Sequence, residues 1–438
     1  MKRIERVSNR LNERYTLIEH SSGLAIYVFP KPLTSTHVIF SVRYGSLDSC
    51  FRSEGEEEWI TVPDGVAHFL EHKMFENADG SDSFEHFSAC GADANAYTTC
   101  DRTAYLFSCT DQWQEPLREL LKFVREPHFT SANVKKEQGI IAEEIRMCDD
   151  NPWERCFQNL MEGLYLRHPV RTNICGTEES IARITPELLY ACHSAFYRLP
   201  NMALVVCGDV TAEEVLEVAD ACLPAEREHF AVERAACDEP EEAHLPRMQS
   251  RMQVSKPIFS IGIKDADVPK SSEERLRRDA AMTLLEEILF SRSAEFFSTL
   301  FEEGLLTSSY SFGYSITRDI AFHSVSGESD RPEEVLQRLQ SYLARMAERG
   351  IDAEEFERCR RVLYADEIRS YDNTEEIANN LLVMAFDGAE LFNYPAVLEG
   401  LTVEELNQLL KTMLKPSAFC LSTVDPLEEQ GAEQERSK

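Results

Sequence analysis

Residues 65–76 read GVAHFLEHKMFE, and this stretch has the spacing of an amphipathic helix that carries three titratable side chains on one face. On a helix with 100° per residue, His72 lies about 40° from His68, and Glu71 lies about 60° to the other side. Such groups are unfavourable to bury alone, so they either coat a solvated surface or hold a ligand. Two imidazoles at positions i and i+4 suit a tetrahedral zinc ion, and the carboxylate between them can contact water on the metal.

A catalytic zinc ion typically needs a third protein ligand, and the candidate lies in a second helix-like stretch. This stretch, residues 135–152, reads KKEQGIIAEEIRMCDDNP, and on its wheel Glu137 and Glu144 lie about 20° apart. Both fall within an apolar stripe that includes Ile140, where a lone carboxylate is unfavourable. Glu143 lies about 100° away, at the edge of the stripe, where water can solvate it. Glu144 is therefore predicted to face inward and to need a cation.

Each half of this pattern also has a plain structural explanation. A His-x-x-x-His pair on a surface helix is often simply solvated, and two carboxylates seven residues apart usually mark a solvated face. The joint occurrence of H-x-x-E-H and a downstream pair of carboxylates embedded in an apolar stripe favours a metal site.

Several segments in this order resemble the pitrilysin/insulinase family of zinc peptidases: HFLEH, GADANAYTTCDRTAYLFS and EQGIIAEEIRM. The resemblance continues through GTEESIARITPELLYACHSAFY and NMALVVCGDVTAEEV and covers both halves of the chain. It implies one zinc ion per chain. The resemblance also implies that His68, His72 and Glu144 are the zinc ligands and that Glu71 is the general base. Glu137 would adjust the site through contacts to the ligands, without binding the metal itself. Asn95 and Ala96 would lie on an edge strand that accepts the substrate backbone.

One part of the family pattern is missing from the C-terminal half. Family members usually carry an Arg and, seven residues later, a Tyr near a Gly-Leu pair, and these two side chains help to grip the substrate. Here the corresponding positions hold Leu300 and Thr307, and the other register, which uses Tyr310, puts Glu303 in place of the Arg. We expect Tyr310 and Tyr314 to be sheet residues instead.

The chain length resembles half of the family's long single-chain enzymes, whose four domains close around the substrate. We therefore expect a dimer, with a related subunit that supplies the Arg–Tyr function and lacks its own H-x-x-E-H. A homodimer is the alternative.

The order of predicted elements divides the chain into two similar halves, each with strands, a helix, more strands, several helices and a closing strand. Neither half alternates strands and helices strictly, so we predict an α+β fold of two similar domains, each a mainly antiparallel sheet packed with helices on one face. The predicted elements include one helix over about 177–197 and one strand over about 250–264. The predicted divisions are an N-terminal metallopeptidase domain at 1–225, a linker at 226–248, a related C-terminal domain without a metal site at 249–426, and a frayed tail at 427–438.

Composition limits the partners and the compartment. The 438 residues carry a formal net charge of −32, which repels nucleic acid and anionic lipid, so neither is expected as a partner. The thirteen cysteines form no CxxC pair and favour reduced thiols over a disulfide framework. The N-terminus lacks an apolar signal region, and no apolar run approaches about 18 residues. We expect a cytoplasmic protein.

The sequence therefore predicts a zinc-dependent endopeptidase that hydrolyses peptide bonds of short or unfolded peptides. Two alternatives stay open. The chain could be a non-catalytic structural or assembly subunit of a peptidase-like complex, or a dedicated processing protease for one precursor.

Overall fold

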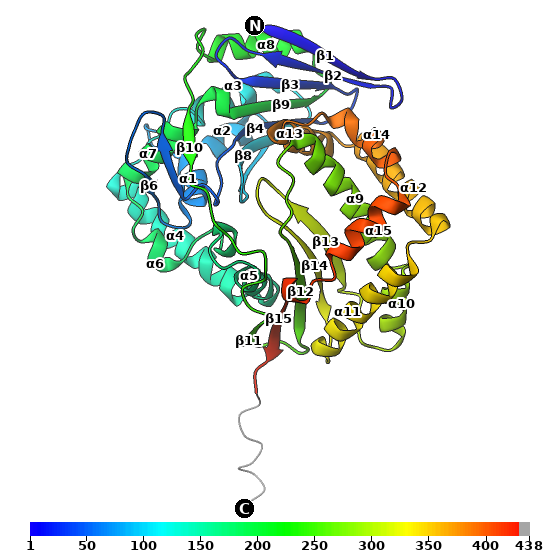
Figure 1. Ribbon diagram of the computed structural model, residues 1–438. Coiled ribbons are helices and arrows are strands. Elements are labelled where there is room, and N and C mark those ends of the chain that lie inside the picture. The colour runs from blue at the N-terminus through cyan, green and yellow to red at the C-terminus, as the bar shows by residue number, and fades with distance from the viewer. Residues whose placement is uncertain (429–438) are drawn as a thin grey trace, which may run out of the picture. The chain divides into compact units, whose positions relative to one another are not determined.

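The computed structural model describes residues 1–428, which form two compact units, each built around one large sheet (Figure 1). The predicted divisions follow chain order. In the structure, by contrast, each unit also contains a segment from the other half of the chain. Of the predicted tail, only residues 427 and 428 lie within the described part. Unit 1 comprises Met1–Ile145, Thr172–Cys237 and Leu363–Ala396, and unit 2 comprises Arg146–Arg171, Asp238–Val362 and, of the described residues, 397–428.

Unit 1 contains a seven-stranded sheet with the order β1-β2-β3-β9-β4-β8-β7. β3 and β9 pair in parallel, and the other neighbouring strands of this sheet pair antiparallel. The central strands β4 and β9 are buried along their whole length, whereas β7 is an edge strand. The strands are β1 (Lys2–Ser8), β2 (Glu13–Glu19), β3 (Ala25–Pro30), β4 (Thr36–Val42), β7 (Asp93–Thr98), β8 (Thr103–Cys109) and β9 (Met202–Gly208), with a small second sheet of β10 (Val232–Arg234), β5 (Cys50–Ser53) and β6 (Ile60–Thr61).

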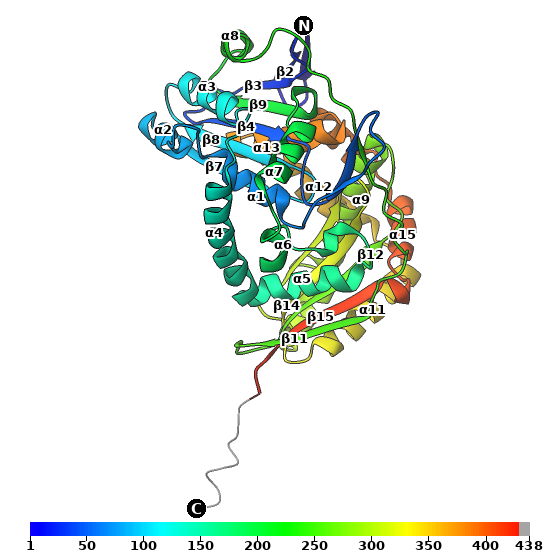
Figure 2. The same cartoon turned by 90° about the vertical axis from the view of Figure 1, so that its left-hand side faces the viewer.

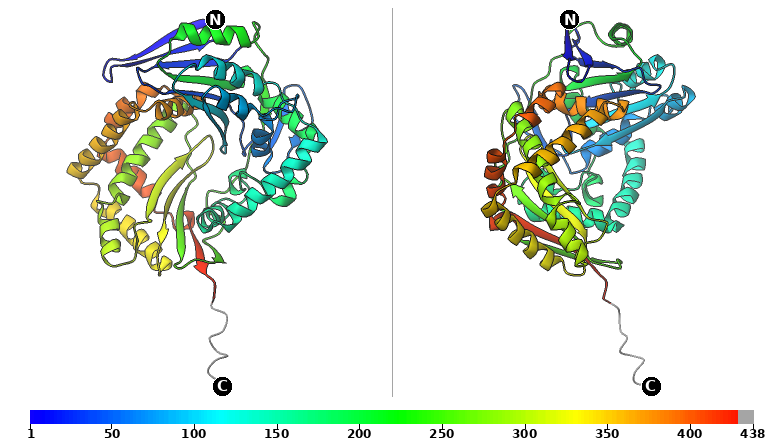
Figure 3. Two further views of the ribbon diagram at one scale, coloured as in Figure 1. Left: turned by 180° about the vertical axis from the view of Figure 1, so that it is seen from behind. Right: turned by 90° about the vertical axis from the view of Figure 1, so that its right-hand side faces the viewer.

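Helices cover both faces of the large sheet in unit 1, whereas the predicted domain had helices on one face only, because α13 (Thr374–Asp387) arrives from the second half of the chain. One face carries the main core, to which α1–α4 and α6–α8 contribute, and α13 packs on the other face against β4 and β9 (Figures 1 and 3). Leu381 and Leu382 of α13 are buried in that second core. The other helices of unit 1 are α1 (Val66–Met74), α2 (Ser83–Ala89), α3 (Gln114–Phe123), α4 (Ser131–Asp150, which continues into unit 2 after Ile145), α6 (Glu178–Ile181), α7 (Pro186–Phe196) and α8 (Ala212–Cys222).

Unit 2 contains a five-stranded sheet with the order β11-β15-β12-β14-β13. β11 and β15 pair in parallel, and the remaining pairs are antiparallel. The strands are β11 (Arg247–Met252), β12 (Ile258–Asp265), β13 (Ser311–Ile316), β14 (Ala321–Glu328) and β15 (Phe419–Pro426). The helices are α5 (Pro152–Leu164), α9 (Ser272–Phe290), α10 (Glu295–Glu302), α11 (Pro332–Arg349) and α15 (Val403–Thr412), while α12 (Ala353–Ser370) and α14 (Tyr394–Glu399) cross between the units.

The helix α5 comes from the first half of the chain but packs on the sheet of unit 2. The approach is close, because a Cβ added at Gly163 would lie 2.3 Å from the Cys420 sulfur and one added at Gly262 would lie 2.8 Å from a Leu164 methyl. Glycine at these two positions therefore lets the helix lie directly against β12 and β15. In the same way, α13 comes from the second half of the chain and covers the sheet of unit 1.

Two predicted elements are each divided in the structure. The predicted helix at 177–197 forms α6 and α7, because Thr185 caps a new helix at the Leu188 N–H and Pro186 occupies its first turn. The predicted strand at 250–264 forms β11 and β12, with Pro257 in the connection. In both cases a proline marks the interruption, since it lacks the N–H that a continuous element needs.

In unit 2, a residue of the predicted linker holds a turn together. Glu239 accepts hydrogen bonds from the N–H groups of Leu166, Arg167 and His168, at 2.8–2.9 Å, and from the Lys264 ammonium at 2.7 Å. Although burial opposes ionisation, the Lys264 ammonium and these N–H donors lower the pKa of Glu239 to about 2. The predicted linker is therefore partly an ordered component of unit 2.

Replacing Glu239 by glutamine is expected to lower the free energy of unfolding of unit 2 by about 1–2 kcal/mol at pH 7, because bonds to a charged acceptor are lost. A carboxylate whose folded pKa is depressed stabilises the fold above its ordinary pKa. The difference between wild type and E239Q should therefore shrink as pH falls from about 4.5 toward 2. Urea denaturation at pH 7 and pH 3 measures it, with the exposed neighbour Glu241→Gln as the control; equal midpoints for wild type and E239Q at pH 7 would contradict this role.

Within residues 1–428 no single helix is long and apolar enough to span a membrane, and one bent pair, α13 with Leu391–Glu399, reaches those limits only when its two parts are counted together.

Candidate metal centre

The helix α1 begins at a backbone position that favours glycine. Gly65 has φ +90°, and a Cβ there would lie 2.5 Å from the carbonyl oxygen of Cys175. Glycine therefore allows the loop before α6 to lie against the start of α1. Along α1, Phe69 and Leu70 are fully buried in the main core of unit 1, so the opposite side of the helix is left to its titratable residues.

Three side chains converge on one point in unit 1. His68 Nε2 lies 3.4 Å from one carboxylate oxygen of Glu144, and His72 Nε2 lies 3.6 Å from the other. The two imidazole rings lie 4.5 Å apart, centre to centre. One donor atom from each residue lies within 4.8 Å of the other two. Two imidazole nitrogens and a carboxylate oxygen form the donor set that zinc prefers in catalytic sites, so the residues present fit that ion.

Behind this cluster, Glu137 orients His72. Its Oε1 lies 3.1 Å from His72 Nδ1, so a proton on Nδ1 leaves the Nε2 lone pair free to bind a metal. The other oxygen of Glu137 accepts a hydrogen bond from Lys73 Nζ at 3.3 Å, and Lys73 also pairs with Glu76. Burial opposes ionisation of Glu137, but the bond to His72 and the Lys73 charge lower its pKa overall.

The charges of the cluster support one another. Hydrogen bonding to His68 lowers the pKa of Glu144 despite partial burial. Burial alone would lower the pKa of His72, but its bond to Glu137 and the nearby carboxylates raise it. A metal ion competes with protons for the same nitrogens, so metal binding at this cluster is expected to weaken at acidic pH.

Glu71 lies beside the cluster but does not belong to it. It is 7% exposed, and burial raises its pKa even though a hydrogen bond from Thr98 acts in the opposite direction. That bond runs from Thr98 Oγ1 to Glu71 Oε2 and is 2.5 Å long. The side chain is therefore an available carboxylate near the ligand nitrogens, with a raised affinity for a proton.

The strand β7 lies next to α1 (Figure 2) and carries the two residues predicted to contact substrate. Asn95 and Ala96 pair with Leu106 and Tyr105 of β8. No other strand of unit 1 pairs with β7 within the described residues, so its outer edge lies at the border of the sheet. Asn95 is exposed, and its side-chain oxygen accepts a hydrogen bond from the Ala96 N–H at 2.9 Å.

The helix α4 largely follows the predicted wheel, with one exception. Glu137 is buried, Glu144 is half-buried and Glu143 is exposed, as the spacing predicts. Ile140 is 48% exposed, so its predicted place in a buried stripe is wrong. The buried face of α4 is narrower than the predicted apolar stripe. Its buried apolar residues are Val134, Ile141 and Ile145.

Sequence reasoning missed three side chains of the site. Lys73 is 1% exposed, and its burial is not apparent from the sequence because lysine is usually a surface residue. Thr98 is the last residue of β7, and its sequence context does not distinguish it from other strand residues. Cys175 has its sulfur 3.9 Å from His68 Nε2, and it comes from a loop about a hundred residues away in the chain. No local pattern marks the contacts of Lys73 with Glu137, Thr98 with Glu71 or Cys175 with His68, since each joins separate segments.

Replacing Glu137 by glutamine is expected to lower zinc affinity by about 10–100-fold, as is usual when the partner of a ligating histidine is altered. An amide would present N–H donors to the Lys73 ammonium and remove the negative charge that holds the His72 Nδ1 proton. Competition with a chromophoric chelator measures the affinity. Glu126→Gln, an exposed carboxylate before α4, serves as the control, and equal affinities for both variants would exclude the orienting role.

The second half of the chain shows no replacement for the family's Arg–Tyr pair at the expected positions. Leu300 is buried in α10, and the Tyr310 hydroxyl donates to the Phe290 carbonyl oxygen at 3.0 Å. Tyr314 lies on β13 and donates to Asp265 at 2.9 Å, whereas Tyr310 precedes that strand by one residue. Both tyrosines are thus engaged within unit 2.

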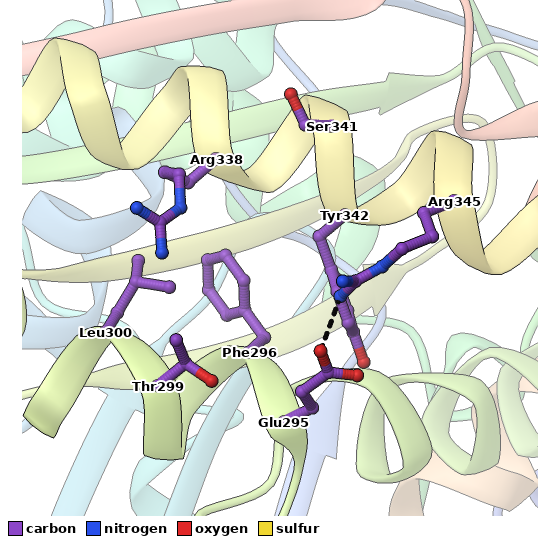
Figure 4. A pocket seen from close by; sticks show the side chains of 8 residues that line it. All are labelled: Glu295, Phe296, Thr299, Leu300, Arg338, Ser341, Tyr342 and Arg345. Atoms are coloured by element: carbon purple, nitrogen blue, oxygen red, sulfur yellow. Dashed lines mark hydrogen bonds and ion pairs between the residues drawn. The ribbon is translucent and has the colours of Figure 1, made fainter.

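A groove of about 200 Å³ lies between α10 and α11 in unit 2 (Figure 4). Its arginines already have carboxylate partners: Arg345 pairs with Glu295 at 2.8 Å and Arg338 with Glu303 at 2.9 Å. The groove is lined by Glu295, Phe296, Thr299, Leu300, Arg338, Ser341, Tyr342 and Arg345.

Two family models match the chain. The model described as insulinase (peptidase family M16) matches residues 61–178, which include the whole His68–His72–Glu144 cluster, and the peptidase M16 inactive domain matches residues 183–363. The uncharacterized zinc protease YmfH of Bacillus subtilis (strain 168) is 36% identical over 409 residues, which cover 93% of this chain and 95% of YmfH.

Solved structures share the fold along nearly the whole chain. An M16-like peptidase from Alicyclobacillus acidocaldarius superimposes with a TM-score of 0.92 at 36% identity, over 96% of this chain and 100% of that one. A chain of complex III2 from Candida albicans also superimposes, with a TM-score of 0.71 at 12% identity, over 93% of this chain and 95% of that one. The predicted two-domain α+β fold is confirmed, and this chain belongs to the insulinase family, peptidase family M16.

Proposed function

We propose that this chain is a zinc-dependent endopeptidase that hydrolyses peptide bonds of short or unfolded peptides. The observation that carries the proposal is the convergence of His68, His72 and Glu144 on one point, with the carboxylate of Glu71 beside it. A chain that serves only as a scaffold has no need for this arrangement of buried and half-buried titratable groups, which is unfavourable unless they hold a ligand.

Zinc would be held by His68 Nε2, His72 Nε2 and one oxygen of Glu144. When bound, the ion supplies Lewis acidity, which polarises a scissile carbonyl and makes a neighbouring water molecule more acidic. Three protein ligands leave room for that water and for the substrate. The pairing of Glu137 with His72 Nδ1 would place the proton of the neutral imidazole on Nδ1 and orient the ring, so that Nε2 is the nitrogen available to a metal.

Glu71 would act as the general base and then as the general acid. It takes a proton from the attacking water and passes it to the nitrogen of the leaving amine. Its burial supports this role, because a carboxylate with a raised pKa can hold a proton between the two transfers more readily than an exposed one.

The substrate would bind as an added strand on the outer edge of β7. Backbone N–H and C=O groups around Asn95 and Ala96 would pair with an extended peptide, which gives affinity without strong side-chain selection. An unfolded or short peptide can adopt this extended form, whereas a folded protein cannot without local opening.

We also propose that the chain acts as a dimer with a related subunit, which would supply the missing Arg–Tyr function. The engagement of Tyr310 and Tyr314 within unit 2 supports this view. A homodimer is the alternative. A cytoplasmic location, expected from the sequence, stays a prediction.

The main rival is a structural subunit, since the same fold occurs in a chain of complex III2 and a fold does not by itself imply an activity. A dedicated processing protease is the other alternative, and it would share the chemistry described above but accept a single precursor.

Metal analysis combined with a peptide-library digest tests the proposal. We expect about one zinc per chain, cleavage of unstructured peptides, loss of cleavage with a chelator and recovery on adding zinc. Copurification with endogenous partners, followed by the same assays, covers the case in which a second subunit is required. Protein that lacks zinc, or that loses it without consequence in either preparation, would favour the structural subunit.

A further inference from the structure

We infer that Thr98 is a positioning residue for Glu71 and that it ties the base to the strand on which a peptide would bind. The inference rests on the proposed function and adds to it a residue outside the metal ligands. Thr98 is the last residue of β7, and Glu71 lies on α1.

The hydrogen bond between them is short and sheltered. Thr98 Oγ1 lies 2.5 Å from Glu71 Oε2, within the range of a hydroxyl bound to a charged carboxylate. Glu71 is 7% exposed and Thr98 is half-buried, so water competes little for this bond. Bonds to charged groups in such surroundings are stronger than those between neutral groups.

The only proton of the Thr98 hydroxyl is committed to Glu71. A threonine hydroxyl can donate one hydrogen bond, and a neighbouring hydroxyl, that of Thr103, lies 3.4 Å away. Thr103 donates its own proton to the carbonyl oxygen of Tyr44 at 2.9 Å. Thr103 therefore does not supply a proton to Glu71, and Thr98 remains its donor.

This bond restricts the carboxylate in a way that suits proton transfer. A glutamate side chain has several rotatable bonds, and ordering it is entropically unfavourable. When Thr98 holds Oε2 of Glu71, the orientation of the carboxylate is restricted. The other oxygen, Oε1, is then the one available to accept a proton. Holding a reacting group in position can account for a large part of a catalytic effect.

The strand geometry connects this contact to peptide binding. Alternate residues of a strand share one face, and Ala94 and Ala96 both pack against the main core of unit 1. Thr98 lies in the same register and reaches Glu71, whereas the exposed Asn95 belongs to the other set. A peptide paired with the outer edge of β7 would stabilise the strand and would therefore also stabilise the position of Glu71.

Two variants of Thr98 test the inference. Thr98→Val, which keeps the side-chain shape but lacks the hydroxyl, should lower kcat by about 10–100-fold while KM changes by less than about threefold. Zinc content should stay at the wild-type level, because no ligand is altered. Thr98→Ser restores the hydroxyl and should return kcat to within about threefold of wild type.

Thr103→Val is the matched control, because it removes a buried hydroxyl from the paired position on β8 and should affect stability rather than kcat. If Thr98→Ser were as impaired as Thr98→Val, the methyl group rather than the hydroxyl would matter and the inference would be wrong. Unchanged kcat in Thr98→Val would refute it as well. Absence of cleavage by the zinc-loaded wild type, alone and with its copurified partner, would instead refute the proposed function and the inference with it.

Discussion

Replacing Glu71 by glutamine is expected to reduce peptide cleavage by about 10²–10⁴-fold while zinc stays bound at the wild-type level. The substitution keeps the size of the side chain and its ability to accept the Thr98 hydrogen bond, but the amide cannot take a proton from water. Because Glu71 is not among the three clustered donors, the ligands themselves are unaltered.

Single-turnover cleavage of an unstructured peptide, with zinc content determined on the same sample, measures both parts of this expectation. Glu85→Gln, an exposed carboxylate on α2, is the matched control and should cleave at the wild-type rate. Full turnover by the E71Q variant would remove Glu71 from the mechanism, and loss of zinc would indicate that Glu71 supports the metal site instead.

Replacing Glu144 by alanine is expected to reduce zinc affinity by more than about 100-fold, because loss of a direct ligand should exceed the 10–100-fold effect typical of an outer partner. The carboxylate of Glu144 reaches both ligand nitrogens, at 3.4 and 3.6 Å. Its removal would leave two imidazoles, which hold zinc weakly compared with a three-ligand site.

Glu143→Ala provides an unusually close comparison, since the two residues are neighbours of the same type on one helix. Glu143 is exposed, and its variant should bind zinc within about twofold of wild type, as expected for a surface substitution. Chelator competition, or the visible spectrum of the cobalt-substituted protein, reports on the site directly. Equal losses in the two variants would mean that Glu144 is not a ligand.

Within single helices, periodicity allowed a detailed prediction. The spacing of His68, Glu71 and His72 placed them on one face of α1, and the wheel of α4 separated Glu144 from Glu143. These predictions succeed because backbone geometry fixes which side chains share a face. The exposure of Ile140 shows where such predictions fail. A helical wheel gives the direction of each side chain, but not how much of the helix surface is covered by the segments packed against it.

The division into units depended on tertiary contacts. α5 packs on the sheet of unit 2 and α13 on the sheet of unit 1, although chain order assigns each helix to the other half. An amphipathic helix needs an apolar surface to cover, but its own sequence does not specify which surface. Complementary packing selects it, as the close contact at Gly163 illustrates.

By itself the sequence determined the family, the fold class and the helical faces that carry the candidate ligands, because these follow from local spacing and from the order of motifs. Only the tertiary structure decided which distant groups meet: Glu144 with His68 and His72, Lys73 with Glu137, and Thr98 with Glu71. Such contacts depend on side-chain packing between segments far apart in the chain, and no local periodicity encodes that packing.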